Sequence, residues 1–163
     1  MRGMAKIVKK HIFTFILIVS IFLLDRISKL LIINLEPIYG LNSYSLTSFL
    51  NFELIWNEGI AFGLLSFNDD LYYNIITMII ILVTLIVFLI MTKSIGIEKY
   101  GFMMVFGGSI GNIFDRLYYS SVPDFIDFHF NNFHWFIFNV ADIFITLGVF
   151  LLIYSEFFKK KND

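Results

Sequence analysis

The chain contains no cysteine, and charged residues make up only 15% of its 163 residues. The absence of cysteine excludes disulfide bonds, thiolate metal sites and a cysteine nucleophile, and it leaves the redox compartment undetermined. Hydrophobic residues make up 58% of the chain, whereas a soluble domain is closer to half apolar. The composition therefore predicts a membrane protein. No repeat, low-complexity tract or domain boundary is visible, so we expect a single domain over residues 1–163.

Long apolar runs predict the membrane-spanning helices. Residues 71–92 are 22 consecutive uncharged residues. As a helix, such a run is about 33 Å long, which matches the hydrocarbon core of a bilayer. Three further apolar runs qualify although each contains charged residues. We therefore predict a mainly α membrane protein with four transmembrane helices, over about residues 12–33, 71–92, 101–118 and 138–155.

The first apolar run also has some features of a cleavable signal peptide, because Lys9 and Lys10 precede it. However, Asp25 and Arg26 follow the apolar stretch directly, and no cleavage site of small residues lies between them. We therefore interpret this run as a membrane helix.

The distribution of basic residues predicts the orientation. Nine of the twelve lysine and arginine residues lie in the two chain ends and in the connection between the second and third runs. The other connections, residues 34–70 and 119–137, contain none. By the positive-inside rule, both termini are expected in the cytoplasm and these two segments outside. The stretch from Phe49 to Trp56 is rich in strand-forming residues, so we expect a small outward-facing β-cradle there.

Several aspartates lie within or beside the apolar runs. A carboxylate at membrane depth is costly, so it is kept only where it is paired, hydrated or functional. Asp25 and Lys29 are spaced i, i+4 on the first helix, close enough to form an ion pair. The simpler interpretation is mutual neutralisation of two buried charges. The functional alternative is that Lys29 orients a lipid or peptide group.

Two polar groups occur in regions of small residues. Gly107 to Gly111 is a small-residue run on the third helix, which favours close packing of helices in lipid. Asn112, Asp115 and Arg116 follow it on one helix face, either as contacts between helices or as part of a site. In the first outer segment, Asn57 precedes Gly59. This Asn can offer a donor and an acceptor to a peptide main chain, but an ordinary turn explains it equally well.

The strongest candidate chemistry involves Asp124, in the second outer segment, and Asp142, near the start of the last run. Asn139 precedes Asp142 by three residues, so its amide can support that carboxylate. Two carboxylates that lie close together cannot both ionise cheaply, which suits proton-sharing acid–base chemistry. The alternative for Asp142 is an acid stabilised by the dipole at a helix N-terminus.

A metal site is not expected from the histidines. His129 and His134 lack the HExxH spacing of zinc peptidases. Asp127 is interpreted as a solvated acid at the membrane interface.

Five segments, taken together, resemble the lipoprotein signal peptidases (signal peptidase II), the membrane aspartic peptidases of bacterial lipoprotein maturation. The resemblance covers nearly the whole chain and follows the family's order. The segments are Asp25-Arg26-x-Ser28-Lys29, Asn57-x-Gly59-x-Ala61-Phe62-Gly63, Gly111-Asn112-x-x-Asp115-Arg116, Val122-x-Asp124-Phe125 and Phe138-Asn139-Val140-Ala141-Asp142.

The resemblance implies roles for these residues. Asp124 and Asp142 match the catalytic pair, which activates a water molecule. The residues that match site-lining or supporting positions are Asn57, Gly59, Asn112, Asp115, Arg116, Asn139, Asp25 and Lys29. One departure is Ile143, which stands where a small polar residue is common in the family. The family's interfacial helix is expected within residues 34–70.

The implied activity is an aspartic endopeptidase that removes the signal peptide from diacylglyceryl-modified prolipoproteins by cleaving before the lipidated Cys. The implied location is the bacterial cytoplasmic (inner) membrane, with several spans and the active site toward the outer face. The expected partners are lipid-modified prolipoproteins and membrane lipid. We expect no cofactor, no metal, no nucleic acid and no obligate protein partner, and hence a monomer.

Two other classes of membrane protein compete with this interpretation. A small proton-coupled carrier also uses intramembrane acids as proton relays, but four spans with no duplicated or inverted halves argue against it. A structural scaffold would use the polar residues only to join helices.

Overall fold

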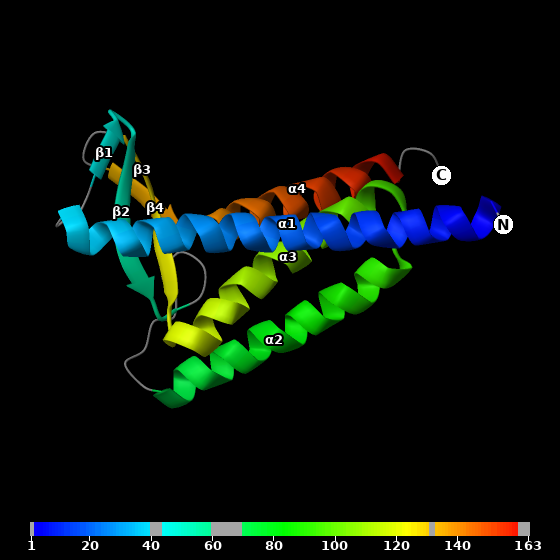
Figure 1. Ribbon diagram of the computed structural model, residues 1–163, viewed down its shortest axis with the longest axis horizontal. Coiled ribbons are helices and arrows are strands. Elements are labelled where there is room, and N and C mark those ends of the chain that lie inside the picture. The colour runs from blue at the N-terminus through cyan, green and yellow to red at the C-terminus, as the bar shows by residue number, and fades with distance from the viewer. Residues whose placement is uncertain (1, 40–43, 60–69, 131–132, 160–163) are drawn as a thin grey trace.

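The protein is mostly helical, with a small antiparallel sheet at one end (Figure 1). The computed structural model describes residues 2–39, 44–59, 70–130 and 133–159. In chain order, the elements are α1 (Arg2–Tyr39), β1 (Tyr44–Thr47), β2 (Leu50–Asn57), α2 (Asp70–Lys93), α3 (Gly96–Tyr119), β3 (Val122–Phe130), β4 (Phe133–Phe138) and α4 (Val140–Lys159).

Helix α3 lies at the centre of the bundle and packs against α1, α2 and α4. Its glycines allow this close packing. A Cβ added to Gly108 would lie 2.5 Å from the carbonyl oxygen of Ala141 in α4. A Cβ on Gly148 of α4 would lie 2.7 Å from the carbonyl oxygen of Gly101 in α3. The expectation that the small residues of α3 permit close helix packing is therefore confirmed.

The bundle buries polar residues and exposes apolar ones, as suits a lipid environment. Asp25, Lys29 and Asp115 have no exposed surface, whereas Leu71 and Met78 on α2 are more than 60% exposed. Within the described residues, two stretches are long and apolar enough to cross a membrane by length and composition, Leu71–Lys93 and Val140–Phe158. Helices α1 and α3 carry charged residues in their interiors.

Three helices differ in extent from the predicted spans, and one of them is α3, which begins at Gly96 instead of about residue 101. Helix α1 runs well beyond residues 12–33 in both directions. Helix α4 begins at Val140, because Phe138 is still the last residue of β4. The chain changes from strand to helix at Asn139, and this residue is therefore a helix cap instead of an interior helical residue.

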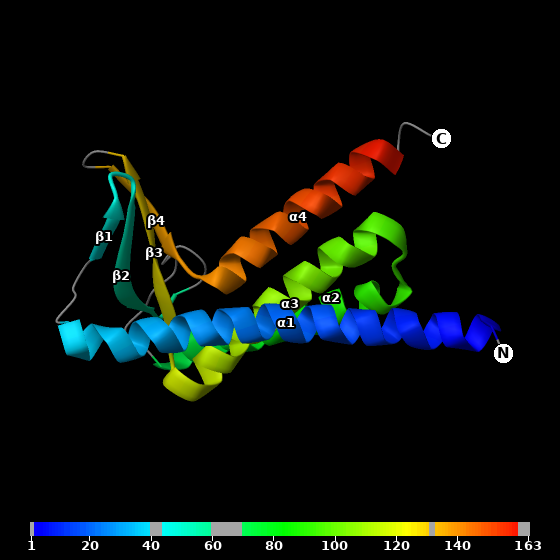
Figure 2. The ribbon, with the colours of Figure 1, turned by 45° about the horizontal axis from the view of Figure 1, so that its top comes forward.

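The sheet has the order β1-β2-β3-β4, and all neighbouring strands are antiparallel. It lies beside the C-terminal end of α1, while the N-terminal end of α1 and the C-terminal end of α4 are both at the opposite end of the molecule (Figures 1 and 2). Strand β2 confirms the predicted strand around Phe49 to Trp56. The expected interfacial helix is absent from residues 44–59, and two other stretches of the expected range, residues 40–43 and 60–69, lie outside the described residues.

Candidate active site

Asp124 lies on β3 at the point where this strand pairs with β2. Its main-chain partner in the register is Ile55, so Asn57 lies close by on the neighbouring strand. The Asn57 amide Nδ2 donates a hydrogen bond to Asp124 Oδ2 at 2.8 Å. Asn139 Nδ2 donates to the other oxygen, Oδ1, at 2.6 Å. Both oxygens of this buried carboxylate are therefore held by side-chain amides.

Asp142 lies in the first turn of α4 and forms a reciprocal cap with Asn139. Asn139 Oδ1 accepts a hydrogen bond from the Asp142 main-chain N–H at 3.1 Å, and Asp142 Oδ2 accepts one from the Asn139 N–H at 3.2 Å. This is the geometry of a capping box, which satisfies N–H groups that a helix start leaves free. Asp142 Oδ1 also accepts a hydrogen bond from Asn112 Nδ2 on α3 at 2.8 Å.

Asn139 therefore contacts both aspartates, since its amide nitrogen binds Asp124 while its main chain and side-chain oxygen bind Asp142. The structure thus brings together two carboxylates that are 18 residues apart in the chain. A cavity of about 300 Å³ opens beside them. It is lined by Asn57, Ile80, Ser109, Asn112, Arg116, Val122, Asn139, Asp142, Ile145 and Thr146.

The environment of Asp124 favours its protonated form. Burial away from water, together with the nearby Asp142 charge, raises the pKa of Asp124 from its ordinary value of 3.8 to about 7. The hydrogen bonds from Asn57 and Asn139 oppose this rise, because they stabilise the charged form. Asp124 is 3% exposed and Asp142 is 8% exposed, so bulk water screens the two charges little.

A buried cluster of charged side chains from α1 and α3 is linked to Asp142 through Asn112. Lys29 Nζ on α1 donates to Asp25 Oδ2 at 2.8 Å and to Asp115 Oδ2 at 2.6 Å. Its third hydrogen bond, at 2.8 Å, goes to Asn112 Oδ1. Because this bond occupies the oxygen of the Asn112 amide, the nitrogen is turned toward Asp142. Lys29 thereby orients a direct partner of Asp142.

Further hydrogen bonds complete the charged cluster. Arg26 forms a hydrogen bond and ion pair with the second oxygen of Asp115. Asp25 Oδ1 accepts a hydrogen bond from the Ala141 main-chain N–H at 2.9 Å, which joins α1 to the start of α4. The predicted ion pair between Asp25 and Lys29 is confirmed.

Arg116 and Asn57 both bind the main chain of Gly59, which lies two residues after the end of β2. The Arg116 guanidinium donates to the Gly59 carbonyl, and Asn57 Oδ1 accepts a hydrogen bond from the Gly59 N–H at 2.8 Å. Both the N–H and the carbonyl of Gly59 are thus bonded. Nη1 of Arg116 is buried and has no hydrogen-bond partner among the described residues, and Arg116 lines the cavity.

We expect Gly111→Ala to destabilise the protein by about 1–3 kcal/mol, the usual range for overpacking a core. The reason is that a Cβ at this position would lie 2.5 Å from Asp25 Oδ2, which Lys29 and the α4 main chain hold in place. Thermal unfolding in detergent measures the effect. Gly107→Ala is the matched control on the same helix, because the three atoms nearest to its Cβ would be Ile21 side-chain atoms, at 3.1–3.3 Å. Equal losses for the two variants would contradict the argument.

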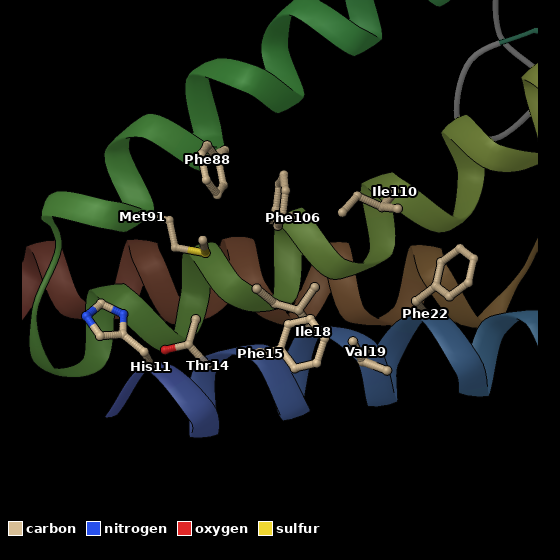
Figure 3. A pocket seen from close by; sticks show the side chains of 10 residues that line it. All are labelled: His11, Thr14, Phe15, Ile18, Val19, Phe22, Phe88, Met91, Phe106 and Ile110. Carbon is tan, nitrogen blue, oxygen red and sulfur yellow. The ribbon is translucent and has the colours of Figure 1, made fainter. Parts of the chain in front are cut away.

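A second cavity, of about 470 Å³, lies between α1, α2 and α3 (Figure 3). Phe15, Phe88 and Phe106 are among the lining residues, and His11 and Thr14 are the polar ones. A mainly hydrocarbon lining offers little support for acid–base chemistry. The candidate active site is therefore the smaller, polar cavity beside Asp124 and Asp142.

The hydrogen bonds described above connect every residue predicted for the site. The connected residues are Asp25, Lys29, Asn57, Gly59, Asn112, Asp115, Arg116, Asp124, Asn139 and Asp142. Sequence reasoning missed the pairing of Arg26 with Asp115. The available signal was that both charges lie in apolar runs and each needs a partner.

One prediction for this region is wrong. Asp127 was expected to be solvated, but it has no exposed surface. It lies on β3, where the sheet covers it, and it accepts hydrogen bonds from Asn51 on β2 and pairs with His134 on β4. Its position at the centre of a sheet, instead of in a loop, is the reason for the difference.

Known proteins resemble this chain over most of its length. The family described as signal peptidase (SPase) II matches residues 17–158. A lipoprotein signal peptidase of Pelagibacter ubique is 46% identical over 158 residues, which is 95% of each chain. One from Rickettsia prowazekii is 38% identical and covers 97% of this chain and 84% of its own.

Solved structures share the fold. A bacterial membrane enzyme determined by the in meso method superposes with a TM-score of 0.72 at 23% identity, covering 93% of this chain and 91% of its own. A second such enzyme has a TM-score of 0.63 at 24% identity and covers 88% and 91%.

Proposed function

The chain belongs to the signal peptidase II family, and from that membership we propose that it is a membrane-embedded aspartic endopeptidase with Asp124 and Asp142 as its catalytic pair. The family is one of bacterial membrane peptidases of lipoprotein maturation. The proposed substrate is a diacylglyceryl-modified prolipoprotein, cleaved just before its lipidated Cys. The observation that supports the proposal most strongly is the pair of buried carboxylates joined through Asn139 at the polar cavity.

The proposed mechanism divides the work between the two carboxyl groups. Asp142 is ionised, since it lies at the positive end of the α4 dipole and receives two hydrogen bonds. It takes a proton from a water molecule, whose oxygen then attacks the scissile carbonyl carbon. Asp124 is protonated and donates its proton to the carbonyl oxygen, which gives a neutral tetrahedral intermediate. As the C–N bond breaks, Asp142 passes the proton it took from water to the leaving nitrogen, and Asp124 regains a proton from a hydroxyl of the intermediate, so both groups return to their starting states. The pair titrates as a unit, because each charge opposes the other.

The supporting residues keep this pair in position. Asn57, Asn112 and Asn139 orient the carboxylates, and Lys29 orients Asn112. Arg116 and Asn57 both line the cavity, and both bind the protein's own main chain at Gly59. Asp25 and Asp115 neutralise Lys29 and Arg26 behind the site.

For the membrane arrangement, we propose that all four helices span the bilayer in a single domain with both termini in the cytoplasm. The sheet and the aspartate pair then lie at the outer face of the cytoplasmic membrane. This proposal is supported by the location of the sheet at one end of the bundle and of the ends of α1 and α4 at the other (Figure 2). The basic residues in the two chain ends also favour it. We also propose that the protein acts as a monomer, because hydrogen bonds within the chain already connect the residues of the proposed site.

A cleavage assay with the purified protein tests the proposal. The protein in detergent is incubated with the same prolipoprotein in two forms, with and without its diacylglyceryl group. We expect release of the signal peptide from the lipidated form and at least a hundredfold slower release from the unlipidated form. Equal cleavage of both forms would remove the lipid from the proposed specificity. Failure to cleave either form would contradict the proposed peptidase activity.

We expect turnover to fall above pH 7, by about tenfold per pH unit, because Asp124 must hold a proton to act as the acid. A pH profile of kcat measures this. Stability should also depend on pH. Asp124 has a higher pKa in the folded state than its ordinary 3.8, so between about pH 4 and pH 7 only the folded state binds this proton. Its contribution to stability is therefore complete below pH 4 and is lost as the pH rises through 7.

The variant Asp124→Asn separates this effect from other titrating groups. It should lack this part of the pH dependence of unfolding, whereas Glu156→Gln, at an exposed position on α4, should retain it. A turnover profile that stays flat from pH 6 to pH 9 in the wild-type enzyme would contradict the assignment of Asp124 as the acid.

A further inference from the structure

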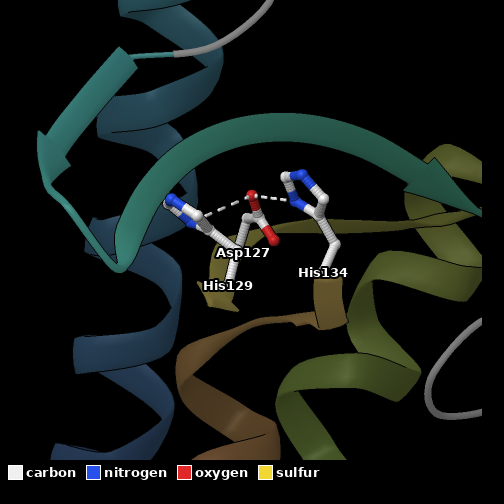
Figure 4. Close-up of side chains that lie close together, drawn as sticks. All are labelled: Asp127, His129 and His134. Atoms are coloured by element: carbon white, nitrogen blue, oxygen red, sulfur yellow. Dashed lines mark hydrogen bonds and ion pairs between the residues drawn. The ribbon is translucent and has the colours of Figure 1, made fainter. Parts of the chain in front are cut away.

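A second cluster of functional side chains lies on the sheet, apart from the aspartate pair. Asp127 and His129 belong to β3, and His134 belongs to β4 (Figure 4). One potential ligand atom of each residue lies within 4.8 Å of those of the other two. His134 Nδ1 is 2.8 Å from Asp127 Oδ2, and His129 Nδ1 is 3.8 Å from the same oxygen. The two imidazole rings stack with their centroids 5.2 Å apart.

The hydrogen bonds within this cluster leave buried polar atoms without partners. Asp127 Oδ2 receives both the Asn51 amide, at 3.2 Å, and His134 Nδ1. Asp127 Oδ1 is buried and has no partner among the described residues, and the same is true of His129 Nδ1. A buried carboxylate oxygen without a partner costs free energy that native structures rarely leave uncompensated. Asp127 has no exposed surface, so bulk water does not supply the missing contact.

A divalent cation bound between the carboxylate and the two imidazoles gives His129 Nδ1 a partner, and a carboxylate that binds it through both oxygens gives Asp127 Oδ1 one as well. The distance of 2.8 Å between His134 Nδ1 and Asp127 Oδ2 is that of a hydrogen bond when Nδ1 carries the ring proton. In the other tautomer both atoms present lone pairs, and one cation beside them can bind both. Two ligand atoms on a tetrahedral zinc, with bonds of about 2.0 Å, lie about 3.3 Å apart. The observed distances of 2.8 and 3.8 Å from Asp127 Oδ2 to the two nitrogens lie on either side of that value.

We propose that Asp127, His129 and His134 form a binding site for a divalent transition metal ion, with Zn²⁺ as the best match. Two imidazoles and one carboxylate are ligands that suit zinc and its neighbours in the first transition row. A water molecule completes the coordination, or the Asn51 side-chain oxygen does so after its amide group, whose nitrogen now faces Asp127, turns over. Asn51 Oδ1 is buried without a partner among the described residues, and its amide lies beside Asp127.

The site is accessible and is separate from the proposed catalytic pair. The His134 side chain is 53% exposed, so an ion can enter from solvent while Asp127 closes the inner side. Within the part of the chain that the structure describes, no hydrogen bond joins any of the three ligands to Asp124 or Asp142. The ion therefore has a structural role: it clamps β3 to β4 and strengthens the hairpin that carries Asp124.

Zinc titration of the full-length protein tests the proposal. The protein is purified in detergent with an affinity tag that contains no histidine, stripped with EDTA, and titrated with ZnCl₂ by isothermal calorimetry. We expect one Zn²⁺ per chain and a zinc-dependent rise in the thermal unfolding midpoint. His134→Ala and His129→Ala should each weaken zinc binding at least tenfold. The chain's remaining histidine, His11, lines the apolar cavity, and His11→Ala should leave zinc binding unchanged.

Several outcomes decide the proposal. His134 is largely exposed, so its removal tests the site without unfolding the protein. Unchanged binding in both His134→Ala and His129→Ala, or no saturable binding in the wild type, would overturn the proposal.

Visible absorption of the Co²⁺-loaded protein should indicate nitrogen and oxygen ligands and should disappear in His134→Ala. EDTA should lower the unfolding midpoint and leave peptidase turnover unchanged, whereas lost turnover that zinc restores would contradict a purely structural ion.

Discussion

Asp124→Asn and Asp142→Asn should each lower the turnover of lipidated prolipoprotein by about a thousandfold or more, a loss typical of removing one member of a catalytic unit. A carboxamide in place of the Asp124 carboxyl group cannot donate a proton as an acid does. A carboxamide in place of the Asp142 carboxylate cannot take a proton from water. Both substitutions preserve size. The hydrogen-bonding neighbours Asn57, Asn112 and Asn139 can reorient their amides to fit.

The measurement must separate chemistry from folding. Each variant is compared with the wild type by single-turnover cleavage, by thermal unfolding in detergent and by binding of the lipidated substrate. We expect binding and unfolding to change little while kcat falls. Glu156→Gln makes the same chemical change at an exposed position on α4 and should cleave at the wild-type rate. Turnover within tenfold of the wild type for either aspartate variant would show that this residue is not part of the catalytic pair.

Lys29→Met should destabilise the protein by about 3–5 kcal/mol, the usual cost of breaking a buried ion pair by removing one partner. The Lys29 ammonium binds Asp25 and Asp115, which are both fully buried. Without it, Asp25 has no cationic partner among the described residues, and Asp115 keeps only Arg26. The methionine side chain is of similar length, so the effect is due to the lost charge and not to a cavity.

The same variant should also affect catalysis. Lys29 holds the oxygen of the Asn112 amide, and its loss frees this amide to rotate away from Asp142. We therefore expect kcat to fall while KM changes little, because Lys29 positions a partner of the carboxylate and is not among the residues that line the cavity. Lys9→Met on the same helix is the control, since Lys9 is exposed. A Lys29→Met protein as stable as the Lys9→Met protein would contradict the buried-charge argument.

Much of the site could be predicted from the sequence because charged residues in apolar runs are costly. Asp25, Lys29 and Asp115 had to find partners, and the i, i+4 spacing already paired the first two. Asn139 was predicted to support Asp142 from its spacing of three residues, and the structure shows that contact as a capping box. The partner of Arg26 could not be read from spacing, since Asp115 is 89 residues away.

The sheet was the least predictable part of the protein. Strand β2 carries enough strand-forming residues to be expected, but β3 and β4 form a hairpin whose pairing depends on contacts across the sheet. This pairing buries Asp127 and brings it to His134, which is why a residue expected in solvent lies in the interior. Burial of a residue in a sheet depends on its neighbours on other strands, and local sequence does not contain that information.

The sequence by itself determined that this protein belongs in a membrane, which helices form, and which charged and amide residues must be satisfied inside it. Those properties follow from local composition, from helical spacing and from the cost of burying charge in lipid. Only the tertiary structure decided that Asn139 joins Asp124 to Asp142, that Lys29 reaches Asn112, and that Asp127 meets two histidines. These contacts join segments far apart in the chain, and their geometry depends on how α1, α3, α4 and the sheet pack together.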